Sequence, residues 1–224
     1  MEMPFQPNEG KNLEIDTDYG RDARYPVKTH VITKDDVLED VLDKYVREYI
    51  QPGDTIIMSE KIVAISQGRA FPIEEIKVSR LAKILSHFVV KTNYGIGLGM
   101  PETMELCIRE VGRVKVLWAA FCAAIGKLFG KHGVFYNICG MKARAIDGPC
   151  EYTLPPYNHY AKMAPDKPDE VAERLTKYLG VDIVIIDAND IGANVLGKPR
   201  KDMPDEFPIQ AFKDNPLDLS LIHI

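Results

Sequence analysis

The chain has 224 residues, of which 46% are hydrophobic, and it carries a formal net charge of −5 at pH 7. This length and apolar content can fill a sizeable core, which excludes a disordered or fibrous chain. The acidic balance gives no electrostatic reason to expect nucleic acid or an anionic membrane as the main partner. We therefore expect a globular protein with no nucleic-acid and no membrane partner.

The first 24 residues are a polar lead-in that lacks the basic start and apolar stretch of a secretory signal. Four widely spaced cysteines, with no CxxC pair, predict reduced thiols. The most apolar run, Val116–Ile125, is far shorter than the roughly 20 residues that a bilayer span needs, and we interpret it as a buried helix. These features predict a cytoplasmic protein.

The first half of the folded part mixes strands and helices. Residues Tyr25–Ile32 predict a strand, and residues 33–50 predict an amphipathic helix with Thr33 as its N-cap. A Pro-Gly turn then leads to an apolar strand over Thr55–Met58. Residues 59–69 combine β-branched and polar side chains, which fits either a continuing strand or a short helix.

The middle of the chain is mainly helical in pattern. Helices are predicted over Ser79–Phe88 and Pro101–Val111, where the proline suits a first helical turn. Gly95–Gly99 lacks the spacing of either nucleotide-binding glycine motif, so we interpret it as a connector. Gly133–Cys139 predicts a strand, and residues 140–160 predict a long irregular loop of the kind that is often functional.

A helix is predicted from Pro168 to Tyr178, and it leads into the apolar run Val181–Ile186, which ends at Asp187. An uninterrupted apolar run is typical of a strand that is covered on both faces. Asp187 either binds a metal or substrate or caps the following turn. Because strands and helices intermix without strict alternation, we expect an α+β fold, a mixed β-sheet with flanking helices.

The last six residues affect where we place the C-terminal limit of the folded domain. Residues 219–224 resemble the translation of a sequencing-library adapter, so we exclude them, His223 included, from any site. We expect the natural C-terminus to be missing and the folded domain to cover residues 25–218.

Three carboxylates are candidates for ligation: Asp147 in the irregular loop, Asp187 at the strand end, and Asp190 just beyond it. Hard divalent ions such as Mg²⁺ and Mn²⁺ take carboxylate oxygens as ligands. Asp147 and Asp190 also suit turn positions, and this alternative stays open.

Lys28, Lys61 and Arg69 each stand beside a strand-like segment. They are either surface residues or cations that stabilise the charge of a phosphoryl group during its transfer. The chain contains no GxSxG elbow and no HExxH pair, so the sequence does not support a serine hydrolase or a zinc protease.

Taken in chain order, these segments resemble the gamma-glutamyl ligase family of the deazaflavin coenzyme F-420. The similarity runs from Tyr25 to Gly197 and depends on the order of short motifs rather than on any one of them. The motifs are Gly53-Asp54, Ser59-Glu60-Lys61, Gly68-Arg69, Cys139-Gly140, Leu154-Pro155-Pro156 and Ile186-Asp187-Ala188-Asn189.

The resemblance implies a homodimer that uses GTP or ATP, with Mg²⁺ or Mn²⁺, to activate a carboxylate as an acyl phosphate. The amine of L-glutamate then attacks, so the partners are a small-molecule acid and an amino acid. It implies Asp187 and Lys61 as catalytic residues, and Asp187, Asp147 and Asn189 as metal ligands. The residues implied to face the nucleotide are Pro26, Lys28, Ser59, Glu60, Lys61 and Arg69.

Three positions depart from the family pattern. Lys142 stands where the family has its first metal aspartate, and Asp147 could substitute only if the loop takes a different path. Ile65 stands where the family has a second lysine, and Ala188 replaces the threonine after the second metal aspartate. Lys142 and Ile65 favour an alternative function, a divergent non-catalytic protein that retains the fold and binds a small molecule or nucleotide.

Overall fold

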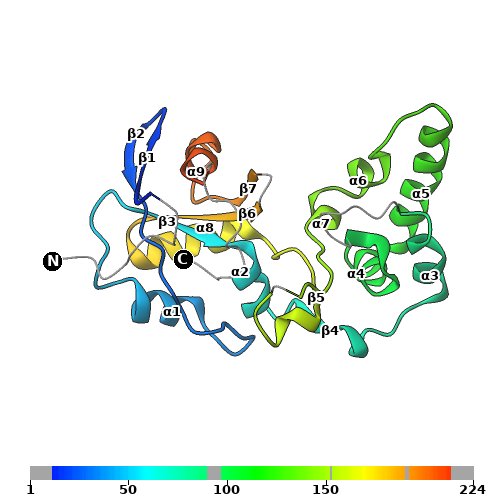
Figure 1. Cartoon of the computed structure of the whole chain (residues 1–224), viewed down its shortest axis with the longest axis horizontal. Coiled ribbons are helices and arrows are strands. Elements are labelled where there is room, and N and C mark those ends of the chain that lie inside the picture. The colour runs from blue at the N-terminus through cyan, green and yellow to red at the C-terminus, as the bar shows by residue number, and fades with distance from the viewer. Residues whose placement is uncertain (1–11, 90–96, 152, 190–191, 213–224) are drawn as a thin grey trace. The chain divides into compact units, whose positions relative to one another are not determined.

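The computed structural model describes residues 12–89, 97–151, 153–189 and 192–212 (Figure 1). The chain forms two compact units: unit 1 combines residues 1–67 with 165–224, and unit 2 holds residues 68–164. Helices occur together with parallel and antiparallel strand pairs, which confirms the predicted α+β fold. Within the described part of the chain, no helix is long and apolar enough to cross a membrane.

Unit 1 is built on a three-stranded sheet in the order β3 (Thr55–Ser59), β6 (Asp182–Asn189) and β7 (Gly192–Gly197). β3 runs parallel to β6, and β7 runs antiparallel to it. Residues 183–186 of β6 are all buried, which confirms a central strand that is covered on both faces.

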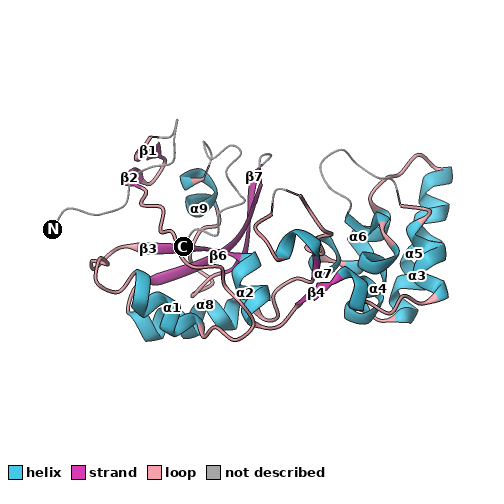
Figure 2. Ribbon diagram, turned by 60° about the horizontal axis from the view of Figure 1, so that its bottom comes forward, coloured by secondary structure: helices cyan, strands magenta, loops and turns pink. Residues whose placement is uncertain are grey.

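Helices lie on both faces of this sheet (Figure 2). Val184, Ile186 and Met203 form a buried cluster, with Phe212 at the end of α9 packed against it. On one face lie α1 (Leu38–Tyr45), α2 (Glu60–Ser66) and α8 (Pro168–Leu179); on the other lie α9 (Glu206–Ala211) and the hairpin of β1 (Glu14–Thr17) and β2 (Gly20–Ala23).

Two predictions for the N-terminal part are wrong. Residues 25–32 form no strand and show only an isolated bridge at Lys28. Val27 and Ile32 are buried and hold this segment in place by side-chain packing. The N-cap of α1 is Val37, not Thr33, whose backbone and side chain both bond to the carboxylate of Asp36.

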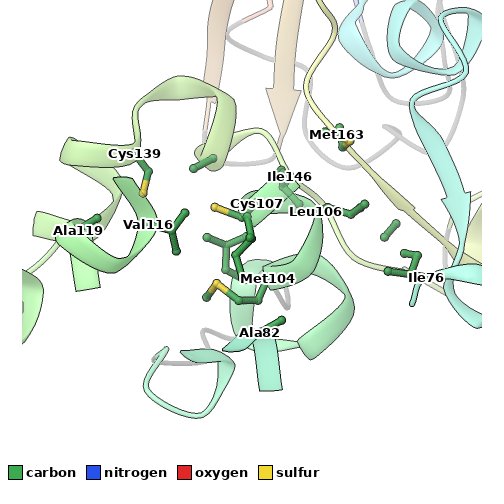
Figure 3. Packing of buried hydrophobic residues seen from close by; sticks show 14 residues of the cluster. Ile76, Ala82, Met104, Leu106, Cys107, Val116, Ala119, Cys139, Ile146 and Met163 are labelled. Carbon is green, nitrogen blue, oxygen red and sulfur yellow. The ribbon is translucent and has the colours of Figure 1, made fainter. Parts of the chain in front are cut away.

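Unit 2 combines a cluster of helices with a short antiparallel pair of β4 (Ala70–Pro72) and β5 (Tyr160–Lys162). Figure 3 shows its core, in which Met104, Cys107 and Val116 are fully buried. Its helices are α3 (Arg80–Ser86), α4 (Pro101–Val111), α5 (Arg113–Leu128), α6 (Val134–Cys139) and α7 (Met141–Arg144), with 3-10 turns at Ile73–Glu75, Gly97–Gly99 and Tyr157–His159.

The helices at α3, α4 and α8 confirm their predictions, but three predictions for unit 2 need correction. Gly133–Cys139 was expected as a strand and is mostly helix α6, which packs against α5. The expected loop 140–160 contains α7 and a 3-10 turn. The helix over Val116–Ile125 exists, but within this range only Val116 and Ala119 are buried. The first two residues of the predicted connector, 95 and 96, lie outside the described residues.

Candidate functional site

The carboxyl ends of β3 and β6 lie side by side in unit 1. The parallel register pairs Ser59 with Ile186, so Glu60 and Asp187 are the next residues along the two strands. Ligands of open sheets with parallel strands collect outside the carboxyl ends of those strands. The fold therefore brings Ser59-Glu60-Lys61 and Asp187, four of the predicted site residues, to one edge of the sheet.

The junction between β3 and α2 fixes the first of these two segments. Ser59 is extended, and its hydroxyl accepts a hydrogen bond of 3.3 Å from the backbone nitrogen of Lys61, so it caps α2. Glu60 is only 1% exposed, which is rare for a carboxylate. Ile65, which stands where the family has a second lysine, is buried on the same helix and offers no charge to a nucleotide.

Asp187 is half-buried and lies opposite Asn194 of β7. β7 was not predicted, so Asn194 was missed as a neighbour of the site. Ala188 packs its methyl group against the apolar cluster of the sheet. Asn189 ends β6 opposite Gly192, and Asp190 lies outside the described residues.

Pro26 and Lys28 also belong to unit 1, in the irregular segment that follows β2. Pro26 is half-buried and Lys28 is exposed. Their roles toward a nucleotide stay predictions.

Asp147 lies in unit 2, where it pairs with Lys162 of β5. The two residues exchange backbone hydrogen bonds of 3.0 and 2.9 Å, and Asp147 Oδ2 lies 3.4 Å from Lys162 Nζ. The lysine is only 6% exposed, so its ammonium needs a nearby anion. The carboxylate of Asp147 balances this buried charge.

Arg69, also in unit 2, belongs to a polar cluster with Glu110 and Lys142. Glu110 Oε2 accepts from Arg69 Nη2 at 2.6 Å, and its Oε1 lies 2.8 Å from Lys142 Nζ. Burial alone would raise the pKa of the Glu110 carboxyl, but the hydrogen bonds from Lys142 and Arg69 outweigh it and hold that pKa below its usual value. No sequence signal pointed to Glu110, because its partners are remote along the chain.

The residues of the two units differ in how well they suit a divalent cation. In the described part of the chain, no three side chains of His, Cys, Asp or Glu come together as a metal centre. The carboxylate of Asp187, at the end of β6, is an oxygen donor of the kind that Mg²⁺ and Mn²⁺ prefer. Lys142 does not fit, because an ammonium bound to Glu110 repels a cation instead of ligating it.

Comparison of the chain with models of known protein families finds a match to one family. The model of the F420-0:gamma-glutamyl ligase family matches residues 26–190, which is more than half of the chain. The match includes both strand ends described above and all of unit 2. Among curated proteins, none matches this chain.

Proposed function

Because the chain belongs to the F420-0:gamma-glutamyl ligase family, we propose that it joins a small-molecule carboxylic acid to an amino acid in a nucleotide- and metal-dependent reaction. Family membership supports the ligase chemistry and an acid of the F420-0 type, with L-glutamate as the amine. The observation that carries the proposal is the parallel pairing of β3 and β6, which sets Ser59-Glu60-Lys61 beside Asp187.

The proposed reaction has two steps. The γ-phosphoryl group of GTP or ATP passes to the substrate carboxylate, which gives an acyl phosphate and the nucleoside diphosphate. The amine then attacks the acyl carbon, phosphate leaves, and the nitrogen loses a proton as the amide forms. Lys61, at the start of α2, would stabilise the charge of the phosphoryl group in transfer.

Asp187 would hold Mg²⁺ or Mn²⁺, with Asn189 as a further ligand, and a bound cation would neutralise charge on the nucleotide phosphates. The proposal rests on the residues of unit 1. Arg69 and Asp147 already have partners of opposite charge in unit 2, namely Glu110 and Lys162. Family membership also supports a homodimer, which light scattering would measure.

The first test is isothermal titration of GTP and ATP, with and without Mn²⁺, into the wild type and into Asp187→Asn. We expect the variant to lose metal-dependent affinity by roughly 100-fold, because a neutral amide replaces the anionic ligand. Asp182→Asn is the matched control: it removes a carboxylate from the other end of the same strand, where Asp182 bonds Arg200 at 2.7 and 2.6 Å. A wild type that binds neither nucleotide would overturn the proposal.

A non-catalytic nucleotide-binding protein is the second candidate. The pairing of Lys142 with Glu110 favours it, since a lysine stands at the position of a family metal aspartate. The two candidates differ in turnover. Release of nucleoside diphosphate that requires both F420-0 and L-glutamate supports the ligase, whereas nucleotide binding without such release supports the binding protein.

A further inference from the structure

Helix α5 exposes most of its large apolar side chains and buries only one narrow face. Val116, Ala119 and Gly126 are its buried residues. At about 100° per residue, the exposed large side chains fall on the opposite face of the helix. They are Val114, Leu117, Trp118, Phe121, Ile125 and Leu128, and Phe129 follows them at the helix end.

This apolar face is contiguous and well exposed. Val114 is 83% exposed and Leu128 is 84% exposed, at opposite ends of the helix. Between them, the rings of Trp118 and Phe121 are in contact, with centroids 5.8 Å apart. Both views place α5 on the side of unit 2 away from β4 and β5 (Figures 1 and 2). An apolar face of this kind on a folded protein marks an interaction surface.

The charged residues along α5 and in the segment that follows it all have one sign. The sequence contains no aspartate or glutamate from Val111 to Ile146, although the whole chain has a net charge of −5. The net charge of the chain therefore hides a local basic segment. The exposed basic residues at the two ends of α5 are Arg113, Lys115, Lys127 and Lys131.

We propose that α5 docks on the anionic surface of a lipid bilayer and lies in the plane of the interface. The apolar face enters the boundary of the acyl chains, and the flanking basic residues meet the anionic headgroups. Trp118 suits this depth, because its ring is largely apolar while its indole N–H can bond at the polar edge of the boundary, and Phe121 adds apolar area. The proposal concerns location and is independent of the reaction proposed above.

The same charges disfavour a second copy of the chain as the occupant. In an antiparallel pair of α5 helices, the end that carries Arg113 and Lys115 lies beside the end that carries Lys127 and Lys131 of the other copy. In a parallel pair, each end lies beside its own equivalent. Both arrangements bring positively charged helix ends together, and these repel.

Trp118 is the only tryptophan, so the intrinsic fluorescence of the full chain reports on α5 directly. We would mix the chain with vesicles of phosphatidylcholine alone or with added phosphatidylglycerol, and measure emission and flotation. We expect a shift to shorter wavelength and co-flotation with the anionic vesicles. Both effects should weaken as salt is added, because salt screens the headgroup charge.

Paired variants separate the apolar and basic contributions. The double variant Phe121→Ser with Leu128→Ser should lower partitioning at least about tenfold. Lys115→Gln with Lys127→Gln should lower binding to anionic vesicles by about tenfold and leave binding to phosphatidylcholine unchanged. Val37→Ser and Lys34→Gln, exposed positions of unit 1, are the matched controls and should bind like the wild type. All these side chains are exposed, so the variants should keep the fold.

Two outcomes would overturn the proposal. One is a wild type that floats with neither kind of vesicle. The other is a shift of Trp118 emission with protein concentration alone, without flotation, together with a dimer that the double serine variant abolishes. That second result would assign the face to another copy of the chain.

Discussion

Glu110 holds the charge balance of the polar cluster that it forms with Arg69 and Lys142. Its side chain is only 7% exposed, and it accepts from both cations at once. Arg69 is itself 19% exposed and also donates to the carbonyl of Ala164. A buried anion between two cations is costly to remove, because its partners then lose the negative charge that compensates them.

We expect Glu110→Gln to lower the free energy of unfolding by about 3 kcal/mol, since it leaves the guanidinium of Arg69 poorly compensated. Lys142→Gln is the matched control. It removes a partner that is 54% exposed, and it should cost about 0.5 kcal/mol or less. Urea unfolding of the two variants measures both values. Equal losses in the two variants would contradict a structural role for the buried carboxylate.

The same residue gives a dependence on pH. The pKa of Glu110 is lowered in the folded state, so the unfolded chain takes up this proton first as the pH falls. Its contribution to stability is therefore complete above the usual pKa of 4.5 and is lost as the pH falls through the lower folded-state pKa. The wild type should lose stability more steeply than Glu110→Gln below that pH. Parallel curves from acid titrations of the two proteins would exclude this contribution.

At the scale of residues, the sequence predicted the position of Asp187 at a strand end but none of the ion pairs. An apolar run that ends in a carboxylate is a local signal, and the structure places that carboxylate at the predicted strand end. Glu110 and Lys162 have partners 41 and 15 residues away, so only the fold brings them together. Each ion pair engages a predicted site residue, Arg69 or Asp147, and so lowers its capacity to bind a ligand.

At the scale of elements, β7 and α8 approach more closely than ordinary packing allows for a side chain. A Cβ atom at Gly197 would lie 2.5 Å from both the carbonyl carbon and the oxygen of Pro168. These are backbone atoms at the start of α8, so they cannot move aside as a flexible side chain does. Gly197 thus sets the distance between the sheet and this helix.

Gly197→Ala should therefore destabilise the protein by about 2 kcal/mol, because the methyl group must push β7 away from α8. Gly192→Ala provides the control on the same strand, where a Cβ meets nothing within 4 Å. We expect that change to alter stability by less than about 0.5 kcal/mol. Thermal unfolding of both variants measures these changes in stability. A Gly197→Ala variant as stable as the wild type would show that β7 and α8 can move apart without cost.

The elements that the sequence predicted well are those with a strong local pattern. α8 and β6 follow directly from their apolar periodicity. The strand predicted over Gly133–Cys139 was wrong. Val134, Phe135 and Tyr136 favour strands intrinsically, but packing against α5 holds them in helix α6. The predicted burial of α5 was wrong for a related reason: an apolar run predicts burial, but the neighbours of this helix bury only Val116, Ala119 and Gly126.

At the scale of the whole molecule, unit 2 is an insertion within unit 1, and the two ends of the insertion lie next to each other. On the unit 1 side, Gln67 and Asp166 exchange hydrogen bonds of 2.9 and 2.7 Å. On the unit 2 side, the backbone nitrogen of Met163 donates to the carbonyl of Arg69, and β4 pairs with β5. Within each unit, hydrogen bonds thus close the chain by joining the segment that leads into the insertion to the segment that leads out of it.

This closure predicts that each unit folds without the other. Residues 68–164 have a core of their own, and a short Gly-Ser linker from Gln67 to Pro165 spans ends that are already adjacent, so it adds little loop entropy. We expect both fragments to unfold cooperatively in urea when followed by circular dichroism. A fragment that unfolds without a cooperative transition would mean that its core depends on the other unit.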